Sequence, residues 1–376
     1  MRKRLIKSTG FLYKHLLRRV LFLSKPEEIH DFMAGFGETL GNTKTIANAI
    51  RFATRIENPM LEQTISDIKF QNPIGLAAGF DYEARLTQIS SSIGFGFETV
   101  GTITNLPYKG NAEPMLGRLP KSKSLMVNKG FKNFGAKETI KRLKNHAFEI
   151  PIGISIGRSN SENCNTQKNS IEDIIKTFIL FEKSKVDHSY YELNISCPNL
   201  RGNVIFYPPE KLRELLKEVD SLHLRKPVFV KMPLEEPDNE VIKMLNTIAS
   251  HSPKGVILSN LSKNRKNKFL DVKEVDKFPD NIGSFSGKPT EKRSNELIKL
   301  AYKNFGKSLP IIGCGGVFSA KDAYKKIKLG ASLVQLITGL IYEGPQLPAE
   351  INSGLIDLLK KDGFKNISEA IGVDVN

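Results

Sequence analysis

From residue 70 onwards, short apolar runs alternate with stretches in which apolar residues recur every three or four positions. A short apolar run bounded by turn residues is typical of a buried strand, and the longer period is typical of a helix packed on one face. Eight such strand-then-helix units predict an α/β fold, the (β/α)8 TIM barrel. The predicted strands span residues 74–78, 97–101, 152–156, 191–195, 228–232, 255–258, 310–313 and 333–337.

Two longer segments interrupt this alternation. Residues 105–132 follow the second predicted strand, and residues 262–288, which are charged and weakly periodic, lie between the sixth and seventh strands. Loops of this length are usually functional. We expect the first to be an insertion and the second to extend over the barrel mouth as a lid or a small hairpin.

Residues 1–60 have a different pattern. Apolar side chains recur at helical spacing over residues 11–23 and 29–40, and Pro26, which suits the first turn of a helix, lies between the two stretches. The pattern predicts two short amphipathic helices in an N-terminal segment, residues 1–60, followed by a barrel domain, residues 61–376. No run approaches the roughly 20 apolar residues of a membrane-spanning helix.

The net charge of +16 is unevenly placed, because many basic residues and no acidic residue precede Glu27. Lysine-rich solvated surfaces explain part of this excess, and an anionic membrane, nucleic acid or a mitochondrial transit peptide are alternative explanations of the basic start. The two helices therefore either pack on the barrel or lie in a membrane interface. Three cysteines without a CxxC pair argue against a zinc site or a disulfide framework, so we expect no metal and a reducing compartment.

The residues that follow each strand carry the chemistry of such barrels, because active sites lie at the C-terminal ends of the strands. Glycines after the seventh and eighth strands, Gly315, Gly316 and Gly339, allow backbone N–H groups to approach a phosphate. After the fourth strand, Cys197 lies between asparagines that suit a planar amide or imide ligand, and a thiol there can take a proton if its pKa is lowered. The alternative for Cys197 is a buried apolar filler. Lys231, at the end of the fifth strand, is costly to bury unless its charge is used, for example against a reduced flavin ring.

Five ordered motifs of this sequence resemble the dihydroorotate dehydrogenase family. They are NPIGLAAGFD (72–81), GTIT (101–104), NISCPN (194–199), GCGGV (313–317) and GASLVQLITG (330–339). The start, LFLSKPEEIHDF (21–32), is similar to the N-terminal helical pair of the membrane-associated, quinone-linked class 2 enzymes, including His30. The resemblance covers nearly the whole chain.

The resemblance implies FMN at the barrel mouth and dihydroorotate lying on its ring. Cys197 would take a proton from C5 while a hydride leaves C6, and the reduced flavin would pass electrons to a quinone that enters through residues 11–50. The implied FMN contacts are Ala77, Ala78, Thr102, Lys231, Ser259, Gly287, Gly315, Gly316, Thr338 and Gly339. The implied substrate contacts are Asn128, Asn194, Asn199 and Asn260. The implied location is a peripheral membrane position on the cytoplasmic face of a bacterial inner membrane, with the mitochondrial inner membrane as the alternative.

The sequence departs from the family pattern around the substrate. Cys197 stands where the quinone-linked class normally has Ser, as in the soluble class 1, and Tyr82 stands in place of a Lys that touches flavin and substrate. Ser155 replaces an Asn that usually contacts FMN, and the loop 128–131 is one residue shorter, so that Lys129 is a candidate to supply the missing charge. Leu261 and Ile337 replace a Thr and a Tyr.

Three alternatives to dihydroorotate oxidation remain open at this stage. One is a divergent flavin dehydrogenase acting on another planar dihydro-compound, suggested by Tyr82 and Leu261. A tRNA-dihydrouridine synthase shares the fold and would explain the basic charge, but nothing here resembles its RNA-binding part, and we expect no nucleic-acid partner. The last is a non-enzymatic basic barrel that binds a membrane.

Overall fold

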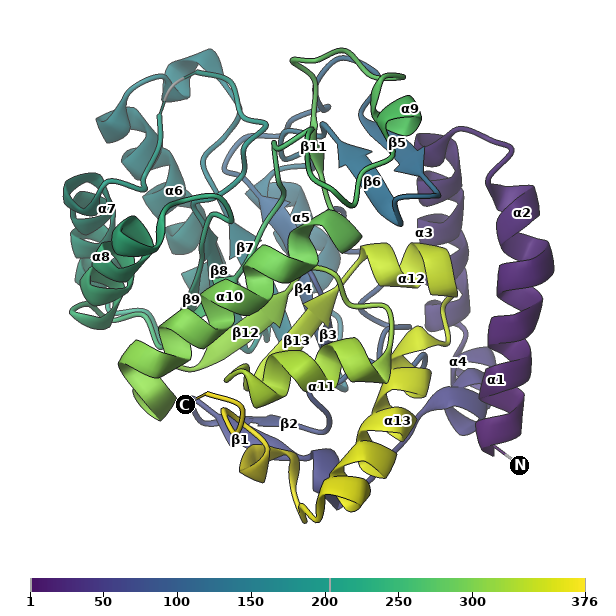
Figure 1. Ribbon diagram of the computed structural model, residues 1–376. Coiled ribbons are helices and arrows are strands. Elements are labelled where there is room, and N and C mark those ends of the chain that lie inside the picture. Colours follow the sequence, from purple (N-terminus) through teal and green to yellow (C-terminus); the bar gives the residue numbers. More distant parts are fainter. Residues whose placement is uncertain (1, 203, 376) are drawn as a thin grey trace.

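Eight parallel strands close into a barrel in the computed structural model, which describes residues 2–202 and 204–375 (Figure 1). The ring closes because β13 pairs with β3, so the predicted (β/α)8 barrel is confirmed. Each predicted strand is present, and its bounds shift by no more than two residues. The barrel strands are β3 (Ile74–Leu76), β4 (Phe97–Ile103), β7 (Ile152–Ile156), β8 (Tyr190–Asn194), β9 (Val228–Lys231), β10 (Gly255–Leu258), β12 (Ile311–Cys314) and β13 (Leu333–Leu336).

Helices surround this ring, with one exception to the expected alternation. The segment 80–95 after β3 forms turns instead of a regular helix. The N-terminal helix α3 (Pro26–Asn42) packs on that segment, and its Gly37 and Gly41 lie so close to it that an added Cβ would meet Leu86 at 2.5 Å and the backbone nitrogen of Ile89 at 2.9 Å. The outer helices are α5 (Ala136–Leu143), α6 (Gln167–Glu182), α7 (Pro209–Ser221), α8 (Asp238–Ala249), α10 (Lys288–Phe305), α11 (Ala320–Lys328), the short α12 (Thr338–Glu343) and α13 (Leu347–Asp362).

Aromatic side chains fill the N-terminal end of the barrel. Phe97, Tyr190 and Phe229 pack there with Phe70 of the hairpin formed by β1 (Gln63–Ile65) and β2 (Ile68–Phe70). Glycines in neighbouring strands make room for the rings, since a Cβ on Gly75 would lie 2.3 Å from the Phe97 ring. Packing of the described residues therefore closes the barrel interior at this end.

The two insertions meet in one small sheet above the barrel mouth (Figure 1). Residues 105–132 contain β5 (Leu116–Leu119) and β6 (Ser124–Val127), and residues 262–288 contain α9 (Val272–Val275) and β11 (Ser284–Phe285). β11 pairs antiparallel with β6, which gives the order β11-β6-β5. The second insertion thus forms part of a cover over the mouth, as expected, but its strand pairs with the first insertion instead of forming its own hairpin.

The N-terminal segment contains more helix than the expected pair. A first continuous helical rod consists of α1 (Arg2–Leu12), a π-helical turn (Tyr13–Leu17) and α2 (Arg18–Leu21), and α4 (Lys44–Thr54) follows α3. The rod is attached to the barrel, because the Tyr13 hydroxyl donates to the carbonyl of Ile341 at 2.8 Å and Arg18 donates to that of Tyr342 at 2.6 Å. Among the described residues, no helix is long and apolar enough to cross a membrane.

Candidate active site

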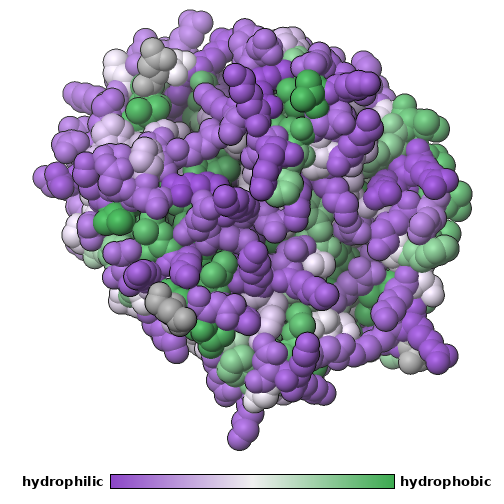
Figure 2. Space-filling model, in the orientation of Figure 1, coloured by the Kyte–Doolittle hydropathy of each residue, from purple (hydrophilic) through white to green (hydrophobic). Residues whose placement is uncertain are grey.

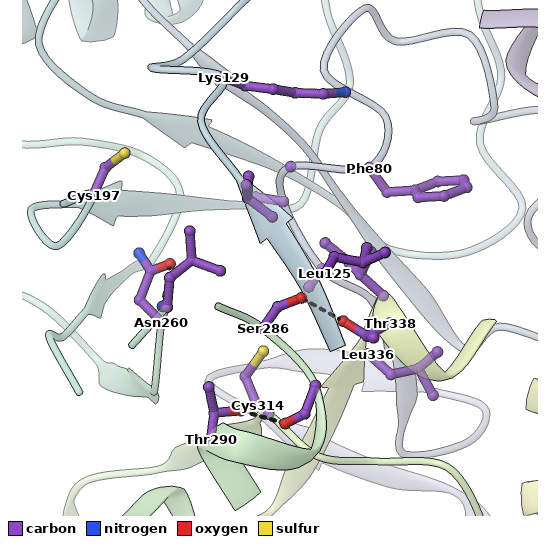
Figure 3. Close-up of a pocket in the computed structure, with 18 of the residues that line it drawn as sticks. Phe80, Leu125, Lys129, Cys197, Asn260, Ser286, Thr290, Cys314, Leu336 and Thr338 are labelled. Atoms are coloured by element: carbon purple, nitrogen blue, oxygen red, sulfur yellow. Dashed lines mark hydrogen bonds between the residues drawn. The ribbon is translucent and has the colours of Figure 1, made fainter. Parts of the chain in front are cut away.

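A cavity at the barrel mouth brings together residues from the ends of seven strands and from the covering sheet (Figure 3). All residues that the sequence assigned to the cofactor line it. They are Ala77, Ala78, Thr102, Lys231, Ser259, Gly287, Gly315, Gly316, Thr338 and Gly339. Cys197, Asn194, Asn199 and Asn260 line the same cavity.

The glycines of the cavity wall form a cradle that side chains would fill. A Cβ on Gly316 would lie 2.3 Å from the Cβ of Glu291, and one on Gly339 would lie 2.0 Å from the carbonyl oxygen of Val317. Gly315 and Gly316 also have φ angles of +101° and +70°, which other residues rarely adopt. The loops after strands seven and eight of a barrel are a frequent phosphate site, so this cradle fits the phosphate of a nucleotide cofactor.

Hydrogen bonds fix the asparagines opposite the cradle. The Asn194 amide donates to Thr102 Oγ1 at 2.8 Å, and its carbonyl oxygen accepts from the Ser196 hydroxyl at 3.2 Å. Asn260 in turn donates to Ser196 Oγ at 2.8 Å. The two amides are thus held in defined orientations at the cavity wall, as recognition of a planar ligand with its own donors and acceptors requires.

Cys197 lies beside these amides, and Figure 3 shows its sulfur pointing toward the interior of the site. Burial raises the pKa of the thiol to about 11, and this effect is partly offset by a backbone hydrogen bond from Asn199 and by the charges of Arg158, Lys231 and Lys263. The thiol is therefore protonated at neutral pH, and its thiolate becomes more abundant as the pH rises. The raised pKa is the opposite of the lowered pKa that favours a base at neutral pH, so proton abstraction by Cys197 would depend on the small fraction of thiolate.

Comparison with known proteins identifies the family. Residues 60–359 match the family model described as dihydroorotate dehydrogenase. The chain belongs to the dihydroorotate dehydrogenase family. It is 34% identical to the dihydroorotate dehydrogenase (quinone) of Nautilia profundicola, over 96% of this chain and 97% of that relative, and 34% identical to the enzyme of the same name from Christiangramia forsetii, over 92% and 99%.

Solved structures agree with this assignment. The structure of the dihydroorotate dehydrogenase of Eimeria tenella in complex with ferulenol has 26% sequence identity to this chain and a TM-score of 0.77, and the match covers 93% of this chain and 95% of the Eimeria chain. Enzymes of the dihydroorotate dehydrogenase family use a flavin. The glycine cradle and the buried lysine of the cavity fit such a cofactor.

Asn128 is the one expected site residue of this family that does not line the cavity. Its side chain accepts a hydrogen bond from Asn111 at 3.0 Å and donates one to the carbonyl oxygen of Ala112 at 3.4 Å. The neighbouring Lys129 lines the cavity instead. The shorter loop 128–131 explains the difference, because the loss of one residue changes which side chain faces the ligand. The substrate contact of Asn128 therefore stays a prediction, and Lys129 is the residue of this loop that lines the cavity.

Tyr82 and Lys129 come together at the cavity wall. The Lys129 ammonium lies 3.9 Å from the centre of the Tyr82 ring, and His30 stacks on the same ring at 5.0 Å. Burial and the nearby charge of Lys132 lower the pKa of Lys129 to about 7. Lys129 thus lies next to Tyr82, which stands where the family has a lysine. This position allows Lys129 to supply the positive charge that the family lysine would otherwise provide.

Several lining residues escaped the sequence analysis. Ser286 and Thr290 flank Gly287 at the start of α10, and the Ser286 hydroxyl is 2.8 Å from that of Thr338 (Figure 3). Their proximity to Gly287 was a usable signal. Phe80 also had a signal, because it follows the first strand within the motif 72–81, whereas the place of Leu125 in the covering sheet depends on tertiary packing.

Replacing Gly316 with Ala tests the cradle. The new Cβ clashes with Glu291 and the left-handed backbone is strained, and overpacking of this kind costs about 3 kcal/mol, or about 100-fold in flavin affinity. The measurement is the flavin content and absorbance of the purified variant, with circular dichroism as a check on folding. The matched control is Gly306→Ala, at a φ of +57° with open space around it, which is expected to keep its flavin.

Proposed function

We propose that this protein oxidises dihydroorotate to orotate in pyrimidine biosynthesis, with FMN as the bound cofactor and a membrane quinone as the electron acceptor. The observation that carries the proposal is the arrangement of one cavity, in which Cys197, three asparagines and Lys231 lie opposite a glycine cradle. Family membership and the names of relatives such as the Nautilia profundicola enzyme support it.

The residues fit FMN and a planar substrate. Gly315, Gly316, Thr338 and Gly339 would hold the phosphate, and Ala77, Ala78, Thr102, Lys231, Ser259 and Gly287 would border the flavin ring. When bound, FMN supplies the acceptor for the hydride that leaves C6 of dihydroorotate. Asn194, Asn199 and Asn260 would orient the substrate amides.

Cys197 is the proposed base. Its thiolate takes the proton from C5, which leaves a neutral thiol, and the electron pair of the broken C–H bond joins the new C5–C6 double bond as the hydride departs from C6. The partly buried position makes the thiolate a stronger base than it is in solution, consistent with its raised pKa.

An apolar cavity beside the active site suits the quinone. It lies between α3, α4 and the barrel, and it shares His30, Phe80, Leu116, Leu125 and Ile341 with the flavin cavity. Apart from His30, Arg118 is the one basic side chain among the described residues that line it. A hydrophobic quinone would reach the edge of the flavin through this space, with Arg118 available to donate to a quinone carbonyl.

The outer face of the N-terminal segment suits a membrane surface. Figure 2 shows apolar residues gathered over the N-terminal helices on the right of the view. Among the described residues, most exposed large apolar side chains lie between positions 5 and 52, including Leu23 at 86% exposure and Phe32 at 63%. Basic residues flank them, which favours an anionic lipid surface. We therefore propose a peripheral position on the cytoplasmic face of a bacterial inner membrane, with the mitochondrial inner membrane as the alternative.

Anaerobic absorbance spectra test the reaction. Dihydroorotate is expected to bleach the flavin band of the purified protein. A yellow protein that stays oxidised would favour the second candidate, a dehydrogenase for another planar dihydro-compound. This candidate is suggested by Tyr82 and Leu261, which line the cavity and depart from the family pattern. A colourless protein would contradict both.

Cys197→Ala is expected to slow reduction of the bound flavin by dihydroorotate by roughly 10²–10⁴, the usual contribution of a general base. In the unchanged protein the stopped-flow rate rises with pH toward about 11, because the reactive form is the thiolate. The control is Cys164→Ala, since Cys164 is also buried but lies outside the cavity. Equal rates in the Cys197 and Cys164 variants would refute the role of Cys197.

Arg118→Met is expected to lower quinone-linked turnover about tenfold, the value of one hydrogen bond to a charged group, while dihydroorotate still reduces the flavin at an unchanged rate. Arg118 stacks on Phe22 and donates to the carbonyl of Ser24 at 2.7 Å. Arg265 makes similar contacts with Phe285 and with backbone carbonyls but does not line the apolar cavity, so Arg265→Met is the matched control. Parallel losses in both half-reactions would point to misfolding.

The double substitution Leu23→Glu/Phe32→Glu tests membrane binding. Loss of two inserted apolar side chains, each worth about 1.5–3 kcal/mol, is expected to weaken binding to vesicles with anionic lipid at least about 100-fold. Val272→Glu is the control, because Val272 is 70% exposed but lies in the cover of the barrel mouth. Sedimentation with vesicles gives the readout, and equal binding by the two variants would contradict the proposal.

A further inference from the structure

A buried ion pair lies at the floor of the flavin cavity. Lys231 at the end of β9 places its Nζ 3.5 Å from Oε1 of Glu192 on β8, and the side chains are 4% and 0% exposed. Lys231 lines the cavity, whereas Glu192 does not. The carboxylate is thus not in direct contact with a ligand in the cavity.

A chain of hydrogen bonds ends on the same carboxylate. The Ser155 hydroxyl donates to Glu192 Oε1 at 2.6 Å, and the hydroxyls of Thr102 and Ser155 are 2.9 Å apart. Because the single proton of Ser155 is directed at Glu192, Thr102 must donate to Ser155, and Thr102 can then accept from Asn194. Glu192 therefore fixes the direction of each bond in the chain, and Ser155, which departs from the family pattern, connects it to the cavity.

We propose that Glu192 is a positioning residue that sets the redox potential of the bound flavin through its ion pair with Lys231. The inference rests on the proposed function, since it concerns the flavin of that site. A positive charge next to the ring favours the reduced, more negative flavin. The Glu192 carboxylate opposes this effect, because its negative charge lies behind Lys231 in a buried environment where charges are weakly screened.

The Oε2 atom of Glu192 supports this function. It has no hydrogen-bond partner, although it is buried. A carboxylate that served only to hold neighbouring strands together would be expected to use both oxygens, because an unpartnered buried polar atom is costly. We therefore attribute the function of Glu192 to its negative charge beside Lys231 and not to its hydrogen bonds.

Glu192→Gln removes the charge and keeps the shape of the side chain. The expected result is a higher flavin potential, with the equilibrium between oxidised and reduced flavin shifted at least about tenfold toward the reduced form, or about 30 mV for two electrons. The measurement is an equilibrium titration of the flavin absorbance against reference dyes. Glu192→Asp keeps the negative charge and is expected to keep a potential close to that of the unchanged protein.

Glu98→Gln is the matched control. Burial, followed by the charge of Asp81, raises the pKa of Glu98 well above its usual range, which favours the neutral form, so we expect the substitution to change little charge. Its side chain is bonded to the Ser90 hydroxyl and does not contact the cavity. The flavin potential of this variant is expected to be unchanged.

A double variant keeps the test informative if Glu192→Gln alone fails to fold. Glu192→Gln/Lys231→Met leaves no buried charge unpaired, and such replacements are usually tolerated. Its potential is expected to fall below that of the unchanged protein, because Lys231 is the nearer of the two charges to the cavity. An unchanged or lowered potential in Glu192→Gln, or an unchanged potential in the double variant, would overturn the inference. A colourless unchanged protein would instead refute the proposed function.

Discussion

Closure of eight parallel strands into a ring is the constraint on which the rest of this structure depends. In a closed parallel barrel, all C-terminal strand ends meet at one mouth, so residues far apart in sequence become neighbours. Cys197 after β8, Lys231 at the end of β9 and Gly315 after β12 share one cavity for this reason. The aromatic packing around Phe97 closes the other end of the barrel interior among the described residues.

The covering sheet and the N-terminal helices, which are added to the barrel, form two neighbouring cavities at its mouth. The sheet β11-β6-β5 covers the flavin cavity, and the N-terminal helices enclose the apolar cavity beside it. His30 and Phe80 lie on both walls, so an electron acceptor in the apolar cavity would meet the edge of the flavin site. The same helices expose apolar side chains outward, so the proposed membrane surface would lie next to the proposed entrance for a lipid-soluble acceptor.

The residues that depart from the family pattern contact other residues that can take over the lost interactions. Tyr82 removes a lysine from the wall, and Lys129 lies over its ring. Ser155 is too short to reach as far as an asparagine, and its hydroxyl instead connects Thr102 to Glu192. The charges at the site are thus redistributed among residues that lie apart in sequence.

The sequence by itself determined the barrel and the strand positions to within two residues, and it named most of the strand-end residues that line the cavity at the mouth. These follow from local periodicity and from short motifs at strand ends, which are properties of neighbouring residues. Only the tertiary structure decided that Asn128 turns away while Lys129 lines the cavity, and that segment 80–95 forms turns covered by α3. It also decided the pairing of β11 with β6 and the contact between Glu192 and Lys231. Such contacts depend on the path of the chain in space, because the favourable partner of a buried charge or an edge strand is set by what the closed barrel brings beside it.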